Sequence, residues 1–147
     1  NNQKFTFSYD PNTASYLIRN VDSGKYLTAA SFTAGADVTQ EDLGGTDRQR
    51  WILVAAGDGS YYVFNRGAYG MCLDVAGFYS GSGGHLQLFT CNRTSNQRWN
   101  LEGVQTIADG TYSICTAMDY SYALDVVGFS KNDCANVQIY RNNGTAN

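Results

Sequence analysis

The chain has 147 residues, enough for one domain that buries most of its apolar surface, so we expect a single domain over residues 1–147. Its formal net charge is −3 and it has no run of basic residues, which argues against nucleic acid as a partner because phosphate backbones are held by clustered lysine and arginine. Aromatic residues make up 14 % of the chain and helix formers are scarce, so strands joined by turns are favoured over helices.

The lengths of the apolar runs and the first residues of the chain indicate whether it enters a membrane and whether it has been processed. No apolar run approaches the roughly 20 residues that would span a bilayer, so membrane insertion is not expected. The chain begins at Asn1 without a methionine, and no signal peptide precedes the first strand. We therefore expect a processed or excised segment of a longer product.

Short strands separated by turns follow one another along the first third of the chain. Polar and apolar residues alternate over 3–9, which predicts a strand with one buried face. Asp-Pro-Asn at 10–12 ends it, because proline cannot donate to a ladder and the other two residues favour turns. Further strands are expected at 15–20, 25–28, 37–41 and 51–54.

The same order of strands recurs twice more. The second unit begins after the turn 57–59 and has apolar runs at 60–63 and 85–88, with Leu73 between them, before it closes at 99–101. The third begins after the Asp-Gly pair at 109–110 and has runs at 111–114 and 136–139, with Leu124 between them. It reaches the last residue without a closing strand of its own.

One triplet marks the period of this repeat. Gln-Arg-Trp stands at 49–51 and at 97–99, and Gln-Lys-Phe stands at 3–5, so the spacings are 46 and 48 residues. We expect three units over about residues 10–54, 55–103 and 104–147, the last one completed by 1–9. Three four-stranded units around one core predict an all-β fold, the β-trefoil with pseudo-threefold symmetry, whose centre is filled by Trp51, Trp99 and Phe5.

The N-terminal strand is expected to close the third unit. Asn-Gln-Lys-Phe at 2–5 is the sequence that should follow 144–146, with Asn2 matching Asn147. Gln3 would then stand next to Asp125 as Gln97 stands next to Asp74. The alternative is a piece cut from a tandem array, in which residues 1–7 are a loose relic.

Four cysteines indicate an oxidising environment. Cys72 and Cys91 are 19 residues apart, and so are Cys115 and Cys134, each pair inside one unit. Neither spacing is the close Cys-x-x-Cys pairing of zinc sites. We predict two disulfides, Cys72–Cys91 and Cys115–Cys134, and an extracellular location; the alternative is four buried free thiols in a cytosolic protein.

The recurring motifs resemble one known family. The Gln-x-Trp triplets, Leu-Asp-Val at 73–75 and 124–126, and Asn-Gly-Thr-Ala-Asn at 143–147 make the whole chain similar to the ricin B-chain-like, or R-type, lectins. Members are β-trefoils that occur as stand-alone lectins, as toxin receptor-binding subunits and as carbohydrate-binding modules of glycosidases. The resemblance implies binding of galactose-type or related glycans without catalysis or a cofactor, by a module of a larger secreted enzyme, toxin or surface protein.

The family pattern also implies two sugar sites. Each repeat of the family can carry an Asp after the leucine of its second strand, a Gln and an aromatic residue in its third strand, and an Asn just before Gln-x-Trp. Two repeats match this pattern, with Asp74, Gln87, Phe89, Asn96 and Gln97 in the second and Asp125, Gln138, Tyr140, Asn147 and Gln3 in the third. The Asp and the aromatic residue are 15 positions apart in both, and the aromatic residue and the Asn are 7 apart in both.

These residue types suit a sugar. A pyranose has an apolar C–H face that can lie on an aromatic ring, and hydroxyls that a carboxylate and an amide can bind. The plainer interpretation is that the two aspartates cap turns and that Phe89 and Tyr140 are ordinary hairpin aromatics. The first repeat has Thr28, Thr39, Glu41 and Arg48 at the four positions, so we expect it to bind no sugar.

Other functions have weaker support in the sequence. His85 is the one histidine, and it sits in Gly-Gly-His without a nucleophile motif nearby, so no catalytic triad is expected. No metal site is indicated either. The remaining alternative is a trefoil that binds protein, as an inhibitor or adhesin, and keeps its sugar pockets only as vestiges.

Overall fold

The computed structural model describes residues 2–102 and 110–143. In these residues it contains twelve β-strands: β1 (Phe5–Asp10), β2 (Ser15–Asn20), β3 (Tyr26–Ala29), β4 (Ala36–Glu41), β5 (Trp51–Ala55), β6 (Tyr61–Asn65), β7 (Met71–Val75), β8 (Gly84–Thr90), β9 (Trp99–Glu102), β10 (Gly110–Thr116), β11 (Tyr122–Val126) and β12 (Ala135–Arg141). Four single-turn 3₁₀ helices lie between them: η1 (Asp47–Gln49), η2 (Ala76–Phe78), η3 (Ser95–Gln97) and η4 (Val127–Phe129). None of the helices in the described residues could cross a membrane.

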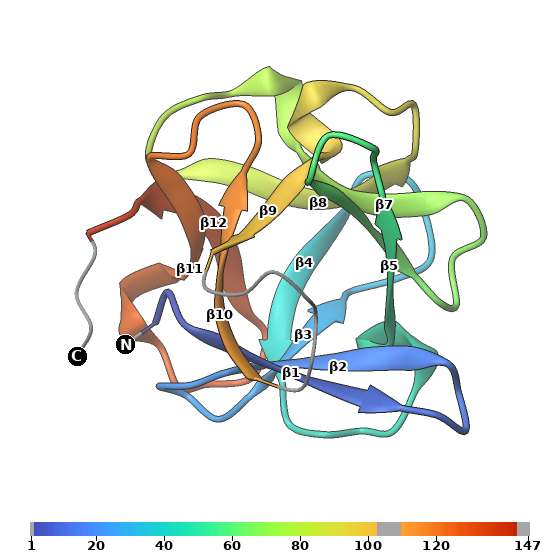
Figure 1. Cartoon of the computed structure of the whole chain (residues 1–147). Helices are drawn as coiled ribbons and strands as arrows, with labels where there is room; N and C mark the ends of the chain where they lie inside the picture. Colours follow the sequence, from blue (N-terminus) through green and yellow to red (C-terminus); the bar gives the residue numbers. More distant parts are fainter. Residues whose placement is uncertain (1, 103–109, 144–147) are drawn as a thin grey trace.

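Six of the strands pair in a closed ring, in the order β1, β2, β5, β6, β9 and β10 (Figure 1). The other six form the hairpins β3–β4, β7–β8 and β11–β12, whose second strands β4, β8 and β12 pair with one another. The sheet therefore has two tiers, a barrel and a cap of three hairpins. The N-terminal strand β1 belongs to the barrel, where it pairs with β10 and β2.

The centre of the barrel holds the aromatic residues of the three triplets. Trp51 and Trp99 are completely buried and Phe5 is 1 % exposed. Each indole N–H donates to the carbonyl of a hairpin leucine, Trp51 to Leu27 at 2.9 Å and Trp99 to Leu73 at 3.1 Å. Burial of each ring removes roughly 150–250 Å² from water, so these residues contribute much of the hydrophobic stabilisation.

The glutamines of the triplets are buried and fully paired. Gln97 donates to the Thr90 carbonyl at 2.9 Å, and its own carbonyl accepts the backbone N–H groups of Asn92 and Arg93. Gln49 likewise donates to the Asp42 carbonyl, and Gln3 donates to the Arg141 carbonyl. Because a buried amide without partners is costly, these bonds hold η1, η3 and the N-terminal segment that carries Gln3 against the hairpin beside each of them.

The predicted Cys115–Cys134 disulfide is wrong. All four cysteines are free thiols in the structure. The Cys115 thiol accepts a hydrogen bond from Asn142, just beyond the end of β12, whereas Cys134 immediately precedes the start of that strand. The seven residues of β12 span roughly 20 Å, and a disulfide needs Cα atoms within about 7 Å.

The equal spacing of the two cysteine pairs is a coincidence. Cys72 lies opposite Phe89 in the β7–β8 hairpin, and Ala123 lies opposite Tyr140 in the β11–β12 hairpin, so Ala123 is the structural equivalent of Cys72. Cys115 lies one strand earlier, in β10, opposite Ala123. The Cys72 and Cys91 side chains, by contrast, lie within hydrogen-bonding reach of each other.

Candidate functional site

The cap hairpin β7–β8 carries a buried carboxylate held by three amide groups. Asp74 is 3 % exposed and lies directly across from Gln87. Its oxygens accept hydrogen bonds from Gln87 Nε2 at 2.8 Å, from Asn96 Nδ2 at 2.9 Å and from Gln97 Nε2 at 2.9 Å. An ionised carboxylate has about four acceptor positions, so about one is left for a ligand.

The hairpin β11–β12 repeats this arrangement with donors from both ends of the chain. Asp125 lies across from Gln138, which donates to it at 3.0 Å. Its other donors are the amides of Asn2 and Gln3. Asn2 also donates to the Val126 carbonyl at 3.0 Å, as Asn96 donates to the Val75 carbonyl at 3.0 Å.

Asn2 therefore occupies the position that the sequence pattern gave to Asn147. Asn147 itself lies outside the described residues. Gln3 stands beside Asp125, where its equivalence to Gln97 predicted it. The structure thus gathers Asp125, Gln138 and Gln3 into one cluster and completes it with Asn2.

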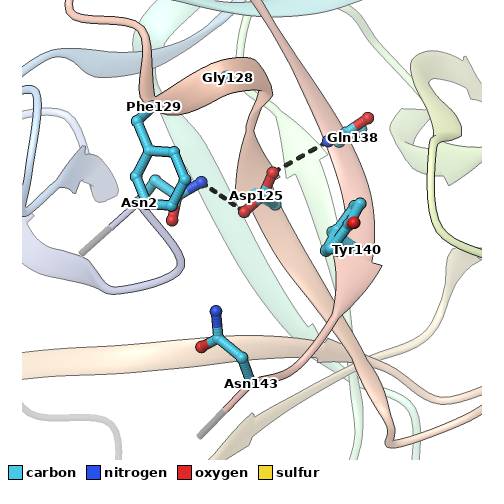
Figure 2. Close-up of a pocket in the computed structure, with 7 residues that line it drawn as sticks. All are labelled: Asn2, Asp125, Gly128, Phe129, Gln138, Tyr140 and Asn143. Atoms are coloured by element: carbon cyan, nitrogen blue, oxygen red, sulfur yellow. Dashed lines mark hydrogen bonds between the residues drawn. The ribbon is translucent and has the colours of Figure 1, made fainter. Parts of the chain in front are cut away.

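A hollow of about 250 Å³ opens above the Asp125 carboxylate. It is lined by Asn2, Asp125, Gly128, Phe129, Gln138, Tyr140 and Asn143. Figure 2 shows Phe129 and Tyr140 on opposite sides of the carboxylate, one from η4 and the other from β12. The floor of the hollow is therefore polar and two of its walls are aromatic.

Sequence reasoning missed Phe129 and its equivalent Phe78. Both end the six-residue pattern Leu-Asp-Val-x-Gly-Phe, at 73–78 and 124–129, and that recurrence was the available signal. It also missed Asn143, which lines the hollow. Phe89 is 38 % exposed and Tyr140 46 % exposed, so both predicted aromatics present part of a ring to solvent.

Burial of the Asp125 carboxyl raises its pKa above the ordinary value of 3.8, because desolvation disfavours the charged form. Hydrogen bonds from Gln138, Gln3 and Asn2 act in the opposite direction, since amide donors favour the carboxylate. The site is arranged to hold an oriented acceptor for a hydroxyl donor.

The corresponding place in the first repeat is filled by an ion pair. Thr28 and Thr39 lie across from each other where the other hairpins have Asp and Gln. Arg48 Nε donates to the Ala29 carbonyl at 2.8 Å, and its guanidinium pairs with Glu41, which stands at the aromatic position. This repeat lacks the carboxylate acceptor and the aromatic ring of the other two.

Comparison with known sequences places this arrangement in a family. The family described as "Ricin-type beta-trefoil lectin domain" matches residues 59–147, and the one described as "Ricin-type beta-trefoil lectin domain-like" matches residues 1–89. The chain belongs to the ricin-type β-trefoil lectin family. The all-β trefoil expected of an R-type lectin is thereby confirmed.

The chain is similar to parts of two larger proteins and to nearly the whole of a designed one. Pierisin of Pieris brassicae is 28 % identical over 130 residues, which are 85 % of this chain and 15 % of that protein. The exo-β-1,3-galactanase 1,3Gal43A of Clostridium thermocellum matches with a TM-score of 0.80 and 31 % identity, over 95 % of this chain and 30 % of that one. The designed three-fold symmetric protein ThreeFoil matches with a TM-score of 0.78 and 30 % identity, over 97 % and 92 %. This ricin-type domain therefore spans only a small part of Pierisin and of the galactanase.

Proposed function

We propose that this chain is a non-catalytic module that binds galactose-type glycans at two shallow sites, one around Asp74 and one around Asp125. The observation that carries the proposal is the pair of matching carboxylates, each held by a Gln across the hairpin and by an Asn-Gln pair. Membership of a lectin family supports the same conclusion, and the match to part of a galactanase supports galactose as the sugar.

Binding follows from the chemistry of the two walls and the floor. One C–H face of the pyranose lies on Tyr140, or on Phe89 in the second repeat, and a hydroxyl donates to the open acceptor position of the aspartate. The side-chain carbonyl of the Asn can accept a hydrogen bond from the next hydroxyl, because both of its N–H groups are already bonded to the aspartate and to a backbone carbonyl. An epimer with a displaced hydroxyl leaves the buried carboxylate without that donor, which is the basis for discrimination.

Each site is expected to be weak. A shallow hollow that contacts one or two rings buries little surface, so a dissociation constant of about 1 mM, or about −4 kcal/mol, is the expected order for a free monosaccharide. Two sites on one rigid body raise the apparent affinity for a multivalent glycan. Glycans on polysaccharides or glycoproteins are therefore the proposed partners.

Nothing in the described residues favours catalysis over binding. His85 is half exposed, with its Nε2 atom 3.2 Å from Asp37 Oδ1, and no hydrogen bond of the described residues joins it to a hydroxyl nucleophile. The described residues also contain no group of His, Cys, Asp and Glu that could hold a metal ion. We therefore assign no catalytic residue.

We further propose that the chain is a circularly permuted trefoil, with repeats over about residues 10–54, 55–103 and 104–147, the last completed by 1–9. Its support is the pairing of β1 with β10 and the contact of Asn2 with Asp125. This domain covers only a small part of Pierisin and of the galactanase. That coverage supports the proposal that the chain is a module of a larger secreted enzyme, toxin or surface protein and acts outside the cell.

A glycan array with the intact protein tests the function. We expect signal on glycans with terminal galactose-type sugars, and competition by free galactose. As a control, Glu41→Gln in the first repeat, where a carboxylate stands at the aromatic position, should leave the pattern unchanged. An array without any signal, together with capture of a protein ligand, would favour the protein-binding alternative.

As the pH is lowered, sugar binding at the third-repeat site should be lost at a higher pH than it would be if Asp125 had the ordinary pKa of an aspartate. Binding needs the ionised Asp125, whose pKa is raised by burial, so affinity is complete above that raised pKa and is lost as the pH falls through it. NMR titration of the Asp74→Ala variant with galactose, from about pH 7 down to about pH 4, measures this site alone. An affinity that stays constant over this whole range would contradict the assignment of Asp125, because its pKa is raised above the ordinary value of 3.8.

A disulfide between Cys72 and Cys91 is predicted to form in oxidising conditions. The two side chains lie within hydrogen-bonding reach, and the closed loop contributes roughly 3 kcal/mol in the chain-entropy model. Alkylation of the unfolded, unreduced protein should then modify Cys115 and Cys134 only, as read by intact mass. Four modified cysteines after air oxidation would show that the bond does not form.

A further inference from the structure

Phe78 and Phe129 have a backbone conformation that is unfavourable for their residue type. Both have positive φ, 56° and 55°, and each follows a glycine that also has positive φ. The left-handed region is disfavoured for a residue with a Cβ atom, and phenylalanine gains no local hydrogen bond there, unlike asparagine. Strain of this kind persists where it serves a function, so its occurrence at both proposed sugar sites needs an explanation.

Burial of the rings does not explain it. Phe78 is 54 % exposed and Phe129 is 61 % exposed. The first repeat offers a comparison, because Phe32 stands at the same place in Leu-Thr-Ala-Ala-Ser-Phe at 27–32. Phe32 has no positive φ, and it packs so closely on Gly67 that a Cβ atom there would lie 2.5 Å from its ring. Phe32 is itself 44 % exposed, so the three phenylalanines differ in backbone conformation more than in exposure. The phenylalanine rests on Gly67 without positive φ where no sugar site is proposed, and it takes the strained conformation at the two proposed sites.

The position of Phe129 adds a second aromatic wall to the hollow. It faces Tyr140 across Asp125, and both rings line the cavity (Figure 2). A galactose-type ring has one continuous C–H face, and its other face carries hydroxyls. If Tyr140 takes the C–H face, Phe129 has no apolar partner on the same ring.

We propose that Phe129, and Phe78 in the second repeat, contact a second sugar ring, so that each site takes a disaccharide or a longer galactose-terminated glycan in preference to a monosaccharide. This rests on the function proposed above. The terminal ring lies on Tyr140 and donates to Asp125, and the next ring lies against Phe129 at the mouth of the hollow. Phe129 is a specificity-determining residue for the length of the glycan.

The test compares a monosaccharide with a disaccharide at one site. In the Asp74→Ala background, calorimetric or NMR titration with methyl β-galactoside and with lactose should give tighter binding of the disaccharide. Phe129→Ala should weaken disaccharide binding roughly three- to tenfold, the range of an aromatic contact, and change monosaccharide binding by less than about twofold. Phe32→Ala in the first repeat is the matched control and should change neither ligand.

A second variant separates the proposal from misfolding. Phe129→Gly relieves the positive-φ strain, so it should raise the melting temperature while it removes the preference for the disaccharide. Equal weakening of both ligands in Phe129→Ala, or equal affinity of the unchanged site for both, would overturn the proposal and leave sugar binding intact. Absence of any sugar binding in the parent protein would instead remove the proposed function together with it.

Discussion

The double variant Asp74→Ala/Asp125→Ala should bind neither free galactose nor a galactose-bearing glycoprotein. Each single variant should keep one site, with the affinity of that site for free sugar unchanged and the number of bound sugars halved. On a multivalent glycoprotein the single variants should lose roughly hundredfold or more in apparent affinity, because simultaneous engagement of two sites is lost. Calorimetry with the monosaccharide and surface plasmon resonance on the glycoprotein measure the two effects.

The same substitutions have a cost in stability that the experiment must account for. Removal of Asp74 leaves one N–H group of each of the amides of Gln87, Asn96 and Gln97 without its acceptor, at about 1–3 kcal/mol for each group that stays buried and unsatisfied. Binding is therefore measured well below the melting temperature of each variant, with Glu41→Gln as the control at the equivalent hairpin of the first repeat. A double variant that binds glycoprotein as well as the parent would show that the two aspartates are not the sugar ligands.

Deletion of residues 1–7 should lower the melting temperature strongly and remove binding at the third repeat. The deletion takes away Phe5 and Phe7, which are 1 % and 0 % exposed, and with them about 3–6 kcal/mol of burial free energy. It also exposes the edges of β10 and β2. The free energy of unfolding of a domain of this size is about 5–15 kcal/mol in total, so the truncated chain should be marginally stable or unfolded.

Single substitutions separate the role of this segment in binding from its role in stability. Asn2→Ala should weaken sugar binding at Asp125 and leave the Asp74 site unchanged, because the Asn2 side chain donates to the Asp125 carboxylate and not to that of Asp74. Asn96→Ala is the matched variant and should do the reverse. A truncated protein that melts and binds like its parent would mean that residues 1–7 are the loose relic of a tandem array.

Much of the fold and of the candidate site could be read from the sequence because both depend on spacing. The equal distances from Asp74 to Phe89 and from Asp125 to Tyr140 reflect equal hairpin registers, in which each Asp lies across from a Gln. The buried triplets recur because the barrel needs an aromatic residue at three places.

What the sequence did not reveal depends on backbone conformation and on which strand carries a residue. Cys115 and Cys134 have the spacing of Cys72 and Cys91. Cys115, however, lies in the barrel strand β10 and not in β11, the hairpin strand that is equivalent to the one that carries Cys72. Phe78 and Phe129 have left-handed φ angles, as do the glycines that precede them, and their rings are exposed. A Gly-Phe pair in a sequence does not by itself specify these backbone angles.

The two sites, alike in chemistry, differ in how far apart along the chain their parts lie. Asp74 and Asn96 are separated by 22 positions, whereas Asn2 and Asp125 are separated by 123. Closing the longer loop costs more chain entropy, and contacts of high sequence separation form late in folding. During refolding the Asp74 site should therefore be complete before the Asp125 site. On the ribosome, the Asp125 site cannot exist until almost all of the chain has been made.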